Sequence, residues 1–189
     1  MSLYKRAFDI ALSALLILLL SPLLFILALA IKLSSKGPVL HRSRRVGRHN
    51  QLFLMPKFRS MRINTPQLPT HLLSNPEAYL TPIGSFLRRS SLDELPQLWN
   101  ILQGNMSFVG PRPALFNQED LVELRTERGI YALVPGLTGW AQVNGRDELP
   151  IAVKVQYDYE YLRRQSFLFD LQIMCLTVKK CLSREGIRH

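Results

Sequence analysis

Cysteine and histidine are scarce in this sequence, and neither follows a pattern that would build a site. The two cysteines, Cys175 and Cys181, lie six residues apart with no second pair, so the sequence indicates neither a disulfide framework nor a zinc site. We expect both to be buried free thiols. The four histidines are scattered without metal-ligand spacing. There is also no internal repeat and no long low-complexity tract, which argues against a repeat protein.

Acidic residues are also few. The chain of 189 residues has 14 Asp and Glu against 24 Lys and Arg, which gives a formal net charge of +10. This excess suggests an anionic partner, which could be nucleic acid, acidic lipid headgroups or a phosphorylated substrate. Basic residues beside a membrane segment are attracted to anionic lipid by about 1 kcal/mol each, so part of the excess can serve adhesion alone. The length suggests one soluble domain of about 150 residues plus a membrane segment.

One long apolar run, "IALSALLILLLSPLLFILALAI", occupies residues 10–31 and is interrupted only by Ser13 and by the pair Ser21–Pro22. As one helix it would measure roughly 33 Å, close to the ~30 Å hydrocarbon core of a bilayer. The run is too long for the apolar core of a signal peptide, and no polar secreted sequence follows it. Its length therefore permits a membrane span.

The flanks of this run are basic on both sides, with Lys5 and Arg6 before it and six Lys or Arg residues between positions 32 and 48 after it. Lys and Arg accumulate on the cytoplasmic side, so this favours two cytosolic ends. Pro22 removes a backbone donor and should bend the helix, and Ser21 can bond a carbonyl that Pro22 frees. Each arm would then measure roughly 14 to 16 Å, the depth of one leaflet. A re-entrant helix and a kinked single span both remain open on these grounds.

The rest of the chain predicts an α+β fold of short helices and a few strands. Residues 37–61 indicate two strands around a turn at Gly47 to Asn50, and residues 63–80, which carry three prolines, indicate a mostly irregular excursion. Short helices are expected after Thr81, as an N-cap, and after Ser91, ending at Gly104. Short strands are expected at the start of residues 105–116 and between Gly139 and the turn at Asn144–Gly145, and a helix over residues 117–128.

Two helices are predicted between about residues 150 and 182, with a break near Gln165 and Ser166. The last one is apolar around most of its circumference, so it could be a core helix or lie in the membrane interface, and we favour partial interfacial contact. The domain division is residues 1–36, a membrane helix with basic flanks, and residues 37–189, a cytosolic domain.

Adjacent carboxylates, Asp93 and Glu94, stand out within "SSLDELPQ". They could simply serve a capping box, Ser91-x-x-Glu94, at a helix start. Their surroundings suggest more, because Arg88 lies just upstream and Arg112 lies downstream between two prolines. A proline-flanked arginine has little backbone freedom, so its guanidinium can bind phosphate at low entropic cost.

Chemistry on a diphosphate would use such a pair. A carboxylate that attacks phosphorus meets like-charge repulsion, so Mg²⁺ and guanidinium groups are needed to neutralise the phosphate oxygens. One carboxylate can then attack phosphorus while the other holds the hydrated metal. The dipole of a helix N-terminus would help to keep both ionised.

Four segments resemble the bacterial sugar transferase family, the monotopic phosphoglycosyl transferases that start glycoconjugate assembly on polyprenyl phosphate. They are "KFRSM" (residues 57–61), "SLDELPQLWNIL" (91–102), "MSFVGPRP" (106–113) and "PGLTGWAQVNGR" (135–146). The similarity runs in order over nearly the whole chain. In that family the opening segment is a re-entrant helix broken at a Ser-Pro pair, which here is Ser21–Pro22. The chain lacks the multi-span extension of larger relatives, so we expect a minimal catalytic unit.

The resemblance implies that a nucleoside diphosphate sugar, such as a UDP-sugar, gives its sugar 1-phosphate to polyprenyl (undecaprenyl) phosphate and releases the nucleoside monophosphate. Asp93 would be the nucleophile, and Glu94 would assist with Mg²⁺, so this pair forms the expected metal site. Asp158 and Asp170 match acidic positions and could act as a base or as support. Basic positions of the family motifs, expected to contact phosphate, are Lys57, Arg59, Arg88, Arg112 and Arg146.

The implied location is the cytosolic face of the bacterial inner membrane, with both ends of the membrane helix cytosolic and anionic lipids as partners. Two alternatives remain. The lipid phosphate could attack directly, with Asp93 only binding metal, or the chain could be a non-catalytic membrane-anchored module for acidic lipid or nucleic acid. We expect no specific nucleic-acid binding. The sugar is not identified by the sequence, and the oligomeric state, possibly a homodimer, stays open.

Overall fold

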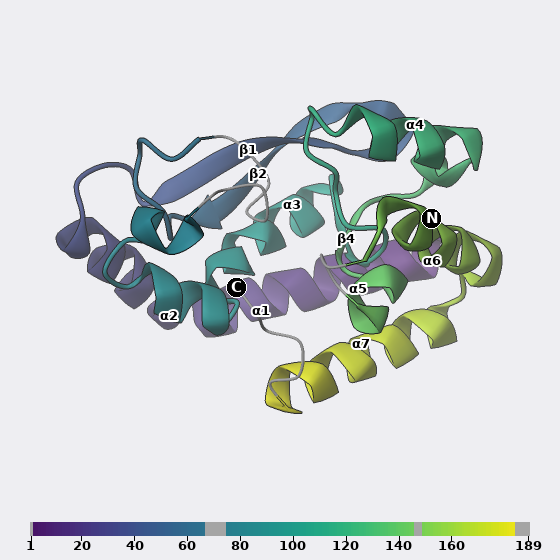
Figure 1. The fold of residues 1–189 in the computed structure, drawn as a ribbon. Coiled ribbons are helices and arrows are strands. Elements are labelled where there is room, and N and C mark those ends of the chain that lie inside the picture. The colour runs from purple at the N-terminus through teal and green to yellow at the C-terminus, as the bar shows by residue number, and fades with distance from the viewer. Residues whose placement is uncertain (1, 67–74, 146–148, 184–189) are drawn as a thin grey trace.

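The computed structural model describes residues 2–66, 75–145 and 149–183, and it mixes helices with short strands (Figure 1). The long first helix runs across the molecule, a hairpin lies above it, and the last helix lies below it. The helices are α1 (Leu3–Ser34), α2 (Gly84–Arg89), α3 (Leu98–Gln103), α4 (Glu119–Glu127), α5 (Trp140–Asn144), α6 (Ile151–Arg164) and α7 (Phe167–Ser183). The strands are β1 (Leu40–Val46), β2 (Leu52–Phe58), β3 (Ser107–Val109) and β4 (Gly136–Thr138). The 3-10 turns are η1 (Arg48–Asn50), η3 (Pro76–Tyr79), η4 (Leu92–Gln97) and η5 (Ile130–Ala132).

Helix α1 continues through Pro22, so the predicted interruption at Ser21–Pro22 is wrong as a break in the helix. The helix changes direction along its length instead (Figure 1). Proline has no N–H to donate to the carbonyl four residues earlier, which is that of Leu18. The Ser21 hydroxyl donates to this carbonyl at 2.8 Å, as the sequence predicted. The serine therefore satisfies the acceptor that the proline leaves open, and the helix can bend without breaking.

The two halves of α1 pack against different apolar clusters. The first half joins the main core through Leu12, Leu16 and Leu20, whereas Leu27 and Ile31 of the second half pack with Phe58 and Leu87. The opposite side of the helix is apolar yet exposed. At least half of the surface of each of its larger residues is accessible, namely Leu15, Leu18, Leu19, Phe25, Ile26, Leu29 and Leu33.

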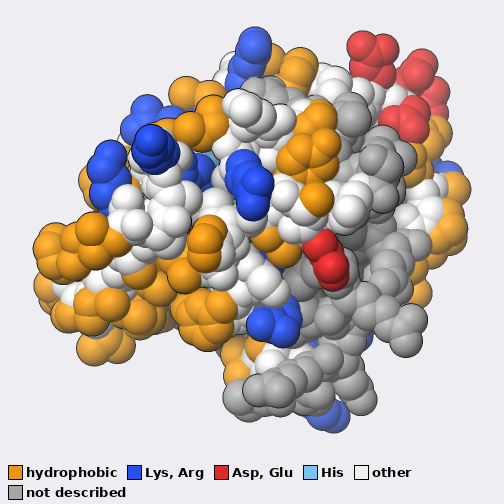
Figure 2. All heavy atoms as spheres, turned by 60° about the vertical axis from the view of Figure 1, so that its left-hand side comes forward, with side chains coloured by type: hydrophobic (Ala, Val, Ile, Leu, Met, Phe, Trp, Pro, Cys, Tyr) orange, Lys and Arg blue, Asp and Glu red, His pale blue; other side chains and the backbone are white. Residues whose placement is uncertain are grey.

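This exposed surface is larger than a water-soluble domain normally tolerates. Helix α1 is also long and apolar enough to cross a membrane. Hydrophobic side chains cover much of the end of the molecule that is turned forward in Figure 2, and Lys and Arg side chains gather above them. One long apolar helix of this kind fits a membrane anchor.

The predicted hairpin is confirmed. Strands β1 and β2 pair antiparallel, from Leu40 opposite Phe58 to Val46 opposite Leu52, around the turn η1. Strands β3 and β4 form a short parallel pair. The strand predicted between Gly139 and Asn144 is wrong, because these residues form helix α5 and the strand β4 ends before Gly139. Strand β2 packs against η4, and this contact brings the end of the hairpin to the Asp93–Glu94 turn.

Two expected helix starts lie elsewhere. Helix α2 begins at Gly84 instead of after Thr81, whose hydroxyl bonds to the carbonyl of Ser60. The segment after Ser91 is first a 3-10 turn, η4, and becomes the α-helix α3 only at Leu98. Pro96 lies inside η4 and has no N–H for an α-helical bond. Helix α3 ends as predicted at Gly104, which has a left-handed φ of 92°.

Helices α6 and α7 confirm the predicted C-terminal pair and the break at Gln165 and Ser166. Phe169 and Ile173 of α7 enter the core, four residues apart on one face, whereas Leu168 remains 78% exposed. Both cysteines are exposed on this helix, so the expectation of buried thiols is wrong. Helix α7 therefore has an apolar side that faces outward, as the predicted contact with the membrane interface requires.

Candidate active site

Asp93 and Glu94 lie in the turn η4, which Ser91 enters with a left-handed φ of 56°. The Ser91 side chain makes no capping hydrogen bond, so the capping-box interpretation is wrong. A non-glycine residue in this conformation is strained, and such strain is often found at functional sites. The turn therefore presents the two carboxylates without using either as a cap.

Glu94 is held by two cations from different parts of the chain. Lys57 of β2 contacts its Oε1 at 2.7 Å, and Arg112 from the loop after β3 contacts the same oxygen at 3.0 Å. Burial alone would raise the pKa of Glu94. The charges and hydrogen bonds of Lys57 and Arg112 outweigh that effect and hold the pKa well below its usual range. Glu94 is thus ionised at any physiological pH.

Asp93 has a different environment. Its side chain is largely buried, with 8% of the residue exposed, and within the described part of the chain no hydrogen bond engages its carboxylate. Burial raises the pKa of Asp93, while the charges of Lys57, Arg88 and Arg112 oppose that rise and the charge of Glu94 adds to it. Two neighbouring carboxylates with separated pKa values can take separate roles.

The predicted phosphate-binding residues divide into two groups. Lys57 and Arg112 meet at the carboxylate pair, and Arg88 of α2 acts on Asp93 through its charge while its guanidinium contacts the Met61 sulfur at 3.8 Å. Arg59 does not join them. Its guanidinium donates to the carbonyls of Ser35 and Lys36 at the end of α1, so the structure gives it an anchoring role. Arg146 lies outside the described residues.

Asp158 and Asp170 both belong to buried ion pairs, which favours support over general-base chemistry. Asp170 lies 2.6 Å from the ammonium of Lys5 and accepts a bond from the Tyr161 hydroxyl at 2.6 Å. Asp158 accepts two bonds from Arg125, at 2.6 and 2.9 Å. The sequence analysis missed Arg125 as a partner. The available signal was a charged residue four positions after Leu121, on the buried face of a predicted helix.

Both ends of α1 are fastened to the same globular domain. Near the first end, Lys5 pairs with Asp170, and the guanidinium of Arg6 donates to the carbonyls of Ile101 and Leu102 at 2.7 and 2.8 Å. At the other end, Arg59 donates to the carbonyls of Ser35 and Lys36, just after the helix. Both ends of the helix are therefore tied to one domain.

The donor set at the carboxylate pair suits magnesium. Mg²⁺ binds through one or two carboxylates together with waters and substrate phosphates, and it does not need a full cage of protein ligands. Asp93 and Glu94 offer such a pair. Among the residues that the structure describes, no group of three or more His, Cys, Asp or Glu could hold a metal ion, so a closed structural site is not formed there.

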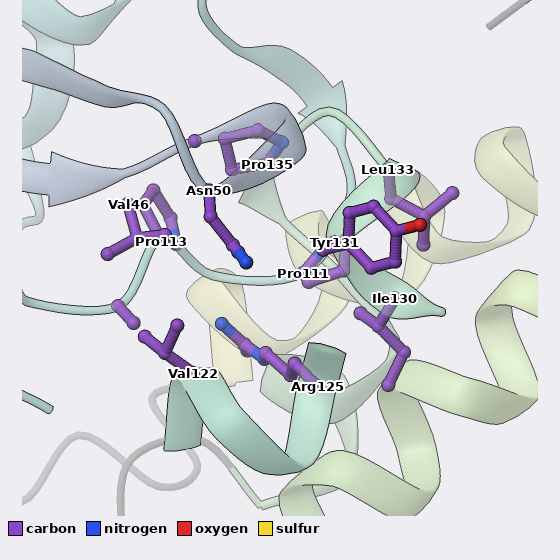
Figure 3. Close-up of a pocket in the computed structure, with 12 residues that line it drawn as sticks. Val46, Asn50, Pro111, Pro113, Val122, Arg125, Ile130, Tyr131, Leu133 and Pro135 are labelled. Atoms are coloured by element: carbon purple, nitrogen blue, oxygen red, sulfur yellow. The ribbon is translucent and has the colours of Figure 1, made fainter. Parts of the chain in front are cut away.

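A small cavity lies next to the Arg112 loop. Pro111 and Pro113, which flank Arg112, line it together with Asn50, Arg125 of α4 and Tyr131 (Figure 3). Its walls are mostly apolar. The Arg112 side chain thus reaches the carboxylate pair, while the backbone of its loop lies beside this cavity.

The carboxylate pair lies among cations, on a domain to which both ends of a long apolar helix are tied, and this arrangement suits a membrane-anchored protein that binds phosphate groups. The comparison with known families makes the assignment specific. The chain belongs to the bacterial sugar transferase family, whose model, described as "Bacterial sugar transferase", matches residues 1–184.

Several named relatives are similar over nearly the whole chain. The UDP-glucose:undecaprenyl-phosphate glucose-1-phosphate transferase of Escherichia coli (strain K12) is 45% identical, with 94% of this chain and 40% of the relative covered. The undecaprenyl-phosphate glucose phosphotransferase of Komagataeibacter xylinus is 44% identical, with 93% and 35% covered. The uncharacterized sugar transferase EpsL of Bacillus subtilis (strain 168) is 38% identical, with 98% and 90% covered. The chain thus spans less than half of the first two and most of the third.

Proposed function

We propose that this chain transfers a sugar 1-phosphate from a nucleoside diphosphate sugar, a UDP-sugar, to undecaprenyl phosphate and releases UMP. The names of both undecaprenyl-phosphate relatives support the acceptor class, and that of the Escherichia coli relative also supports a UDP-sugar donor. The observation that carries the proposal is the division of the carboxylate pair. Glu94 is neutralised by two cations, while the adjacent Asp93 makes no hydrogen bond within the described residues.

The proposed reaction has two steps. A carboxylate oxygen of Asp93 attacks the phosphorus that carries the sugar, and the bond from this phosphorus to the bridging diphosphate oxygen breaks, so UMP leaves with that electron pair. An oxygen of undecaprenyl phosphate then attacks the same phosphorus and displaces Asp93. The first step leaves the sugar phosphate on the aspartate, and the second restores the carboxylate.

The side chains around the pair have defined tasks in this scheme. Lys57 and Arg112 bind phosphate oxygens and reduce the repulsion between them and the attacking carboxylate. Arg88 adds positive charge beside Asp93, which opposes the rise in the pKa of that carboxyl. Mg²⁺, held by Asp93 and Glu94, would supply Lewis-acid stabilisation of the charge that develops on the departing phosphate.

We propose a re-entrant course for α1, with both ends on the cytosolic face of the bacterial inner membrane. A single span would put the two ends on opposite sides of the bilayer. The buried contacts of Lys5 and Arg6 at one end and of Arg59 at the other support a return to one side. The exposed apolar side of α1 would then enter the leaflet, and the basic flanks would meet anionic headgroups.

The test is release of UMP from a panel of UDP-sugars by the purified chain in lipid nanodiscs that contain undecaprenyl phosphate. Asp93→Asn should abolish release, whereas Asp120→Asn on the exposed side of α4 should leave it unchanged. If no UDP-sugar gives UMP, or if Asp93→Asn is fully active, a binding module becomes the better account.

A further inference from the structure

An internal contact chain connects helix α6 with the candidate active site. We propose that Arg125 and Asp158 are positioning residues, which hold the backbone of Arg112 so that its guanidinium meets the phosphate of the donor. The inference rests on the proposed function, because Arg112 gains its task from that reaction. It gives a role in the reaction to two residues that touch neither carboxylate of the pair.

The contacts run through all three nitrogens of one guanidinium. Nε and one terminal nitrogen of Arg125 donate to the same oxygen of Asp158, at 2.9 and 2.6 Å. The other terminal nitrogen donates to the backbone carbonyl of Arg112 at 2.9 Å. Arg112 in turn reaches Glu94 at 3.0 Å. One arginine therefore couples a carboxylate on α6 to the main chain that carries a phosphate-binding side chain.

The pair is buried, which gives these bonds a fixed geometry. Asp158 is 1% exposed and Arg125 is 9% exposed, so water competes little for either. Asp158 directs the planar guanidinium, because bonds from two of its nitrogens converge on one carboxylate oxygen and fix how the group is turned. The remaining terminal N–H group is thereby directed at the backbone carbonyl of Arg112.

The backbone around Arg112 is conformationally restricted, and its carbonyls are hydrogen-bonded. Pro111 and Pro113 flank Arg112, and a proline restricts the residue before it to extended conformations. The neighbouring carbonyls are bonded as well, that of Pro111 by the backbone N–H of Gly136 and that of Pro113 by the guanidinium of Arg45. Arg125 supplies the bond for the carbonyl between them. The cavity of Figure 3 lies on this side of the loop.

A merely structural ion pair would also lower stability when it is broken, so the test must separate the two roles. Arg125→Lys keeps the positive charge next to Asp158. The ammonium has a single nitrogen, however, and does not reproduce the three bonds that the guanidinium nitrogens make to Asp158 and to the Arg112 carbonyl. Arg128→Lys, at the residue that directly follows α4, is the matched control, because Arg128 is exposed and bonds to Gln156.

The experiment measures UMP affinity and the kcat/KM for the UDP-sugar in nanodiscs, together with the thermal unfolding midpoint, for Arg125→Lys, Asp158→Asn, Arg112→Ala and both double variants with Arg112→Ala. We expect Arg125→Lys and Asp158→Asn each to lower kcat/KM by about 10- to 100-fold, the range for a misplaced binding group. UMP affinity should fall in parallel. In the Arg112→Ala background neither change should have a further effect, whereas its thermal cost should persist there.

Two outcomes would overturn the inference. One is an Arg125→Lys variant with the kcat/KM and UMP affinity of Arg128→Lys. The other is a loss of kcat/KM that adds in full to that of Arg112→Ala, since this would show that Arg125 does not act through Arg112. Failure of the proposed function would look different, because the unmodified chain itself would then release no UMP.

Discussion

Lys57 and Arg112 share one oxygen of Glu94, although they come from a hairpin strand and from a loop more than fifty residues later. The contact from Lys57 measures 2.7 Å. These are the two cations expected to bind the donor phosphate, so the glutamate occupies the place of an anion. A phosphate that enters the site must compete with it.

This arrangement predicts an unusual effect of Glu94→Gln. In metal-free buffer the neutral amide should release Lys57 and Arg112, so UMP should bind more tightly than to the unmodified chain, by about tenfold for 1.4 kcal/mol. Turnover with Mg²⁺ should fall, because one carboxylate of the pair is lost. Calorimetric titration with UMP in the presence of a chelator measures the first effect, with Glu123→Gln on α4 as the control. Weaker UMP binding by Glu94→Gln would show that Glu94 does not compete with phosphate.

The pH dependence of turnover should report Asp93. Its carboxylate must be ionised to attack phosphorus, so the rate should rise with pH through its pKa, which burial raises above the ordinary value. Lys57 lowers that pKa. Lys57→Gln should therefore move the acid limb of kcat to higher pH, in addition to lowering the plateau. The exposed Lys179→Gln should leave the limb in place, and an unmoved limb in Lys57→Gln would exclude Asp93 as the titrating group.

The attachment of the N-terminal end of α1 to the domain should depend strongly on one buried ion pair. Lys5→Met leaves Asp170 buried without its cation, and breaking such a pair costs about 3–5 kcal/mol. For a chain of this size we expect the thermal midpoint in nanodiscs to fall by roughly 6 to 20 °C. Arg128→Gln, at an exposed contact, should change it little. A Lys5→Met variant as stable as the control would mean that this end of α1 is not held by Asp170.

The course of α1 can be tested by labelling from outside. Leu3 is 87% exposed and Phe116 is 40% exposed, so Leu3→Cys and Phe116→Cys can each be introduced after Cys175 and Cys181 are replaced by serine. In intact spheroplasts an impermeant maleimide should label neither site, and permeabilised cells should show both. Labelling of Leu3→Cys alone from outside would establish a single span.

Much of the fold could be predicted because its signals are local. The hairpin around Gly47 to Asn50 and the break at Gln165 follow from turn residues and from apolar periodicity, and both were confirmed. The bond of Ser21 to the Leu18 carbonyl followed from the chemistry of proline. The continuity of α1 did not, because the sequence shows that Pro22 removes a bond but not that the remaining turns stay helical.

The site was predicted less completely because its contacts are distant. The carboxylate pair and the cations Lys57 and Arg112 came from motifs, and the structure brings all four together. Arg59 was grouped with Lys57 because both match basic positions of one family motif. Strand β2 ends at Phe58, however, and Arg59, which follows it, bonds to the segment just after α1. The partner of Asp158 lies 33 residues away, and the sequence marks it only as a charged residue on the buried face of a predicted helix.

The central claim is that Asp93 forms a covalent bond to the sugar phosphate of the donor. The most direct measurement is mass spectrometry of the peptide that contains Asp93, after the protein has been mixed with a UDP-sugar that supports turnover, without lipid acceptor, and quenched in acid. We predict the added mass of one sugar phosphate on Asp93, released as product when undecaprenyl phosphate is supplied before the quench. Full UMP formation with lipid present, but no sugar phosphate on the protein at any time point without it, would contradict the claim and favour direct attack by the lipid.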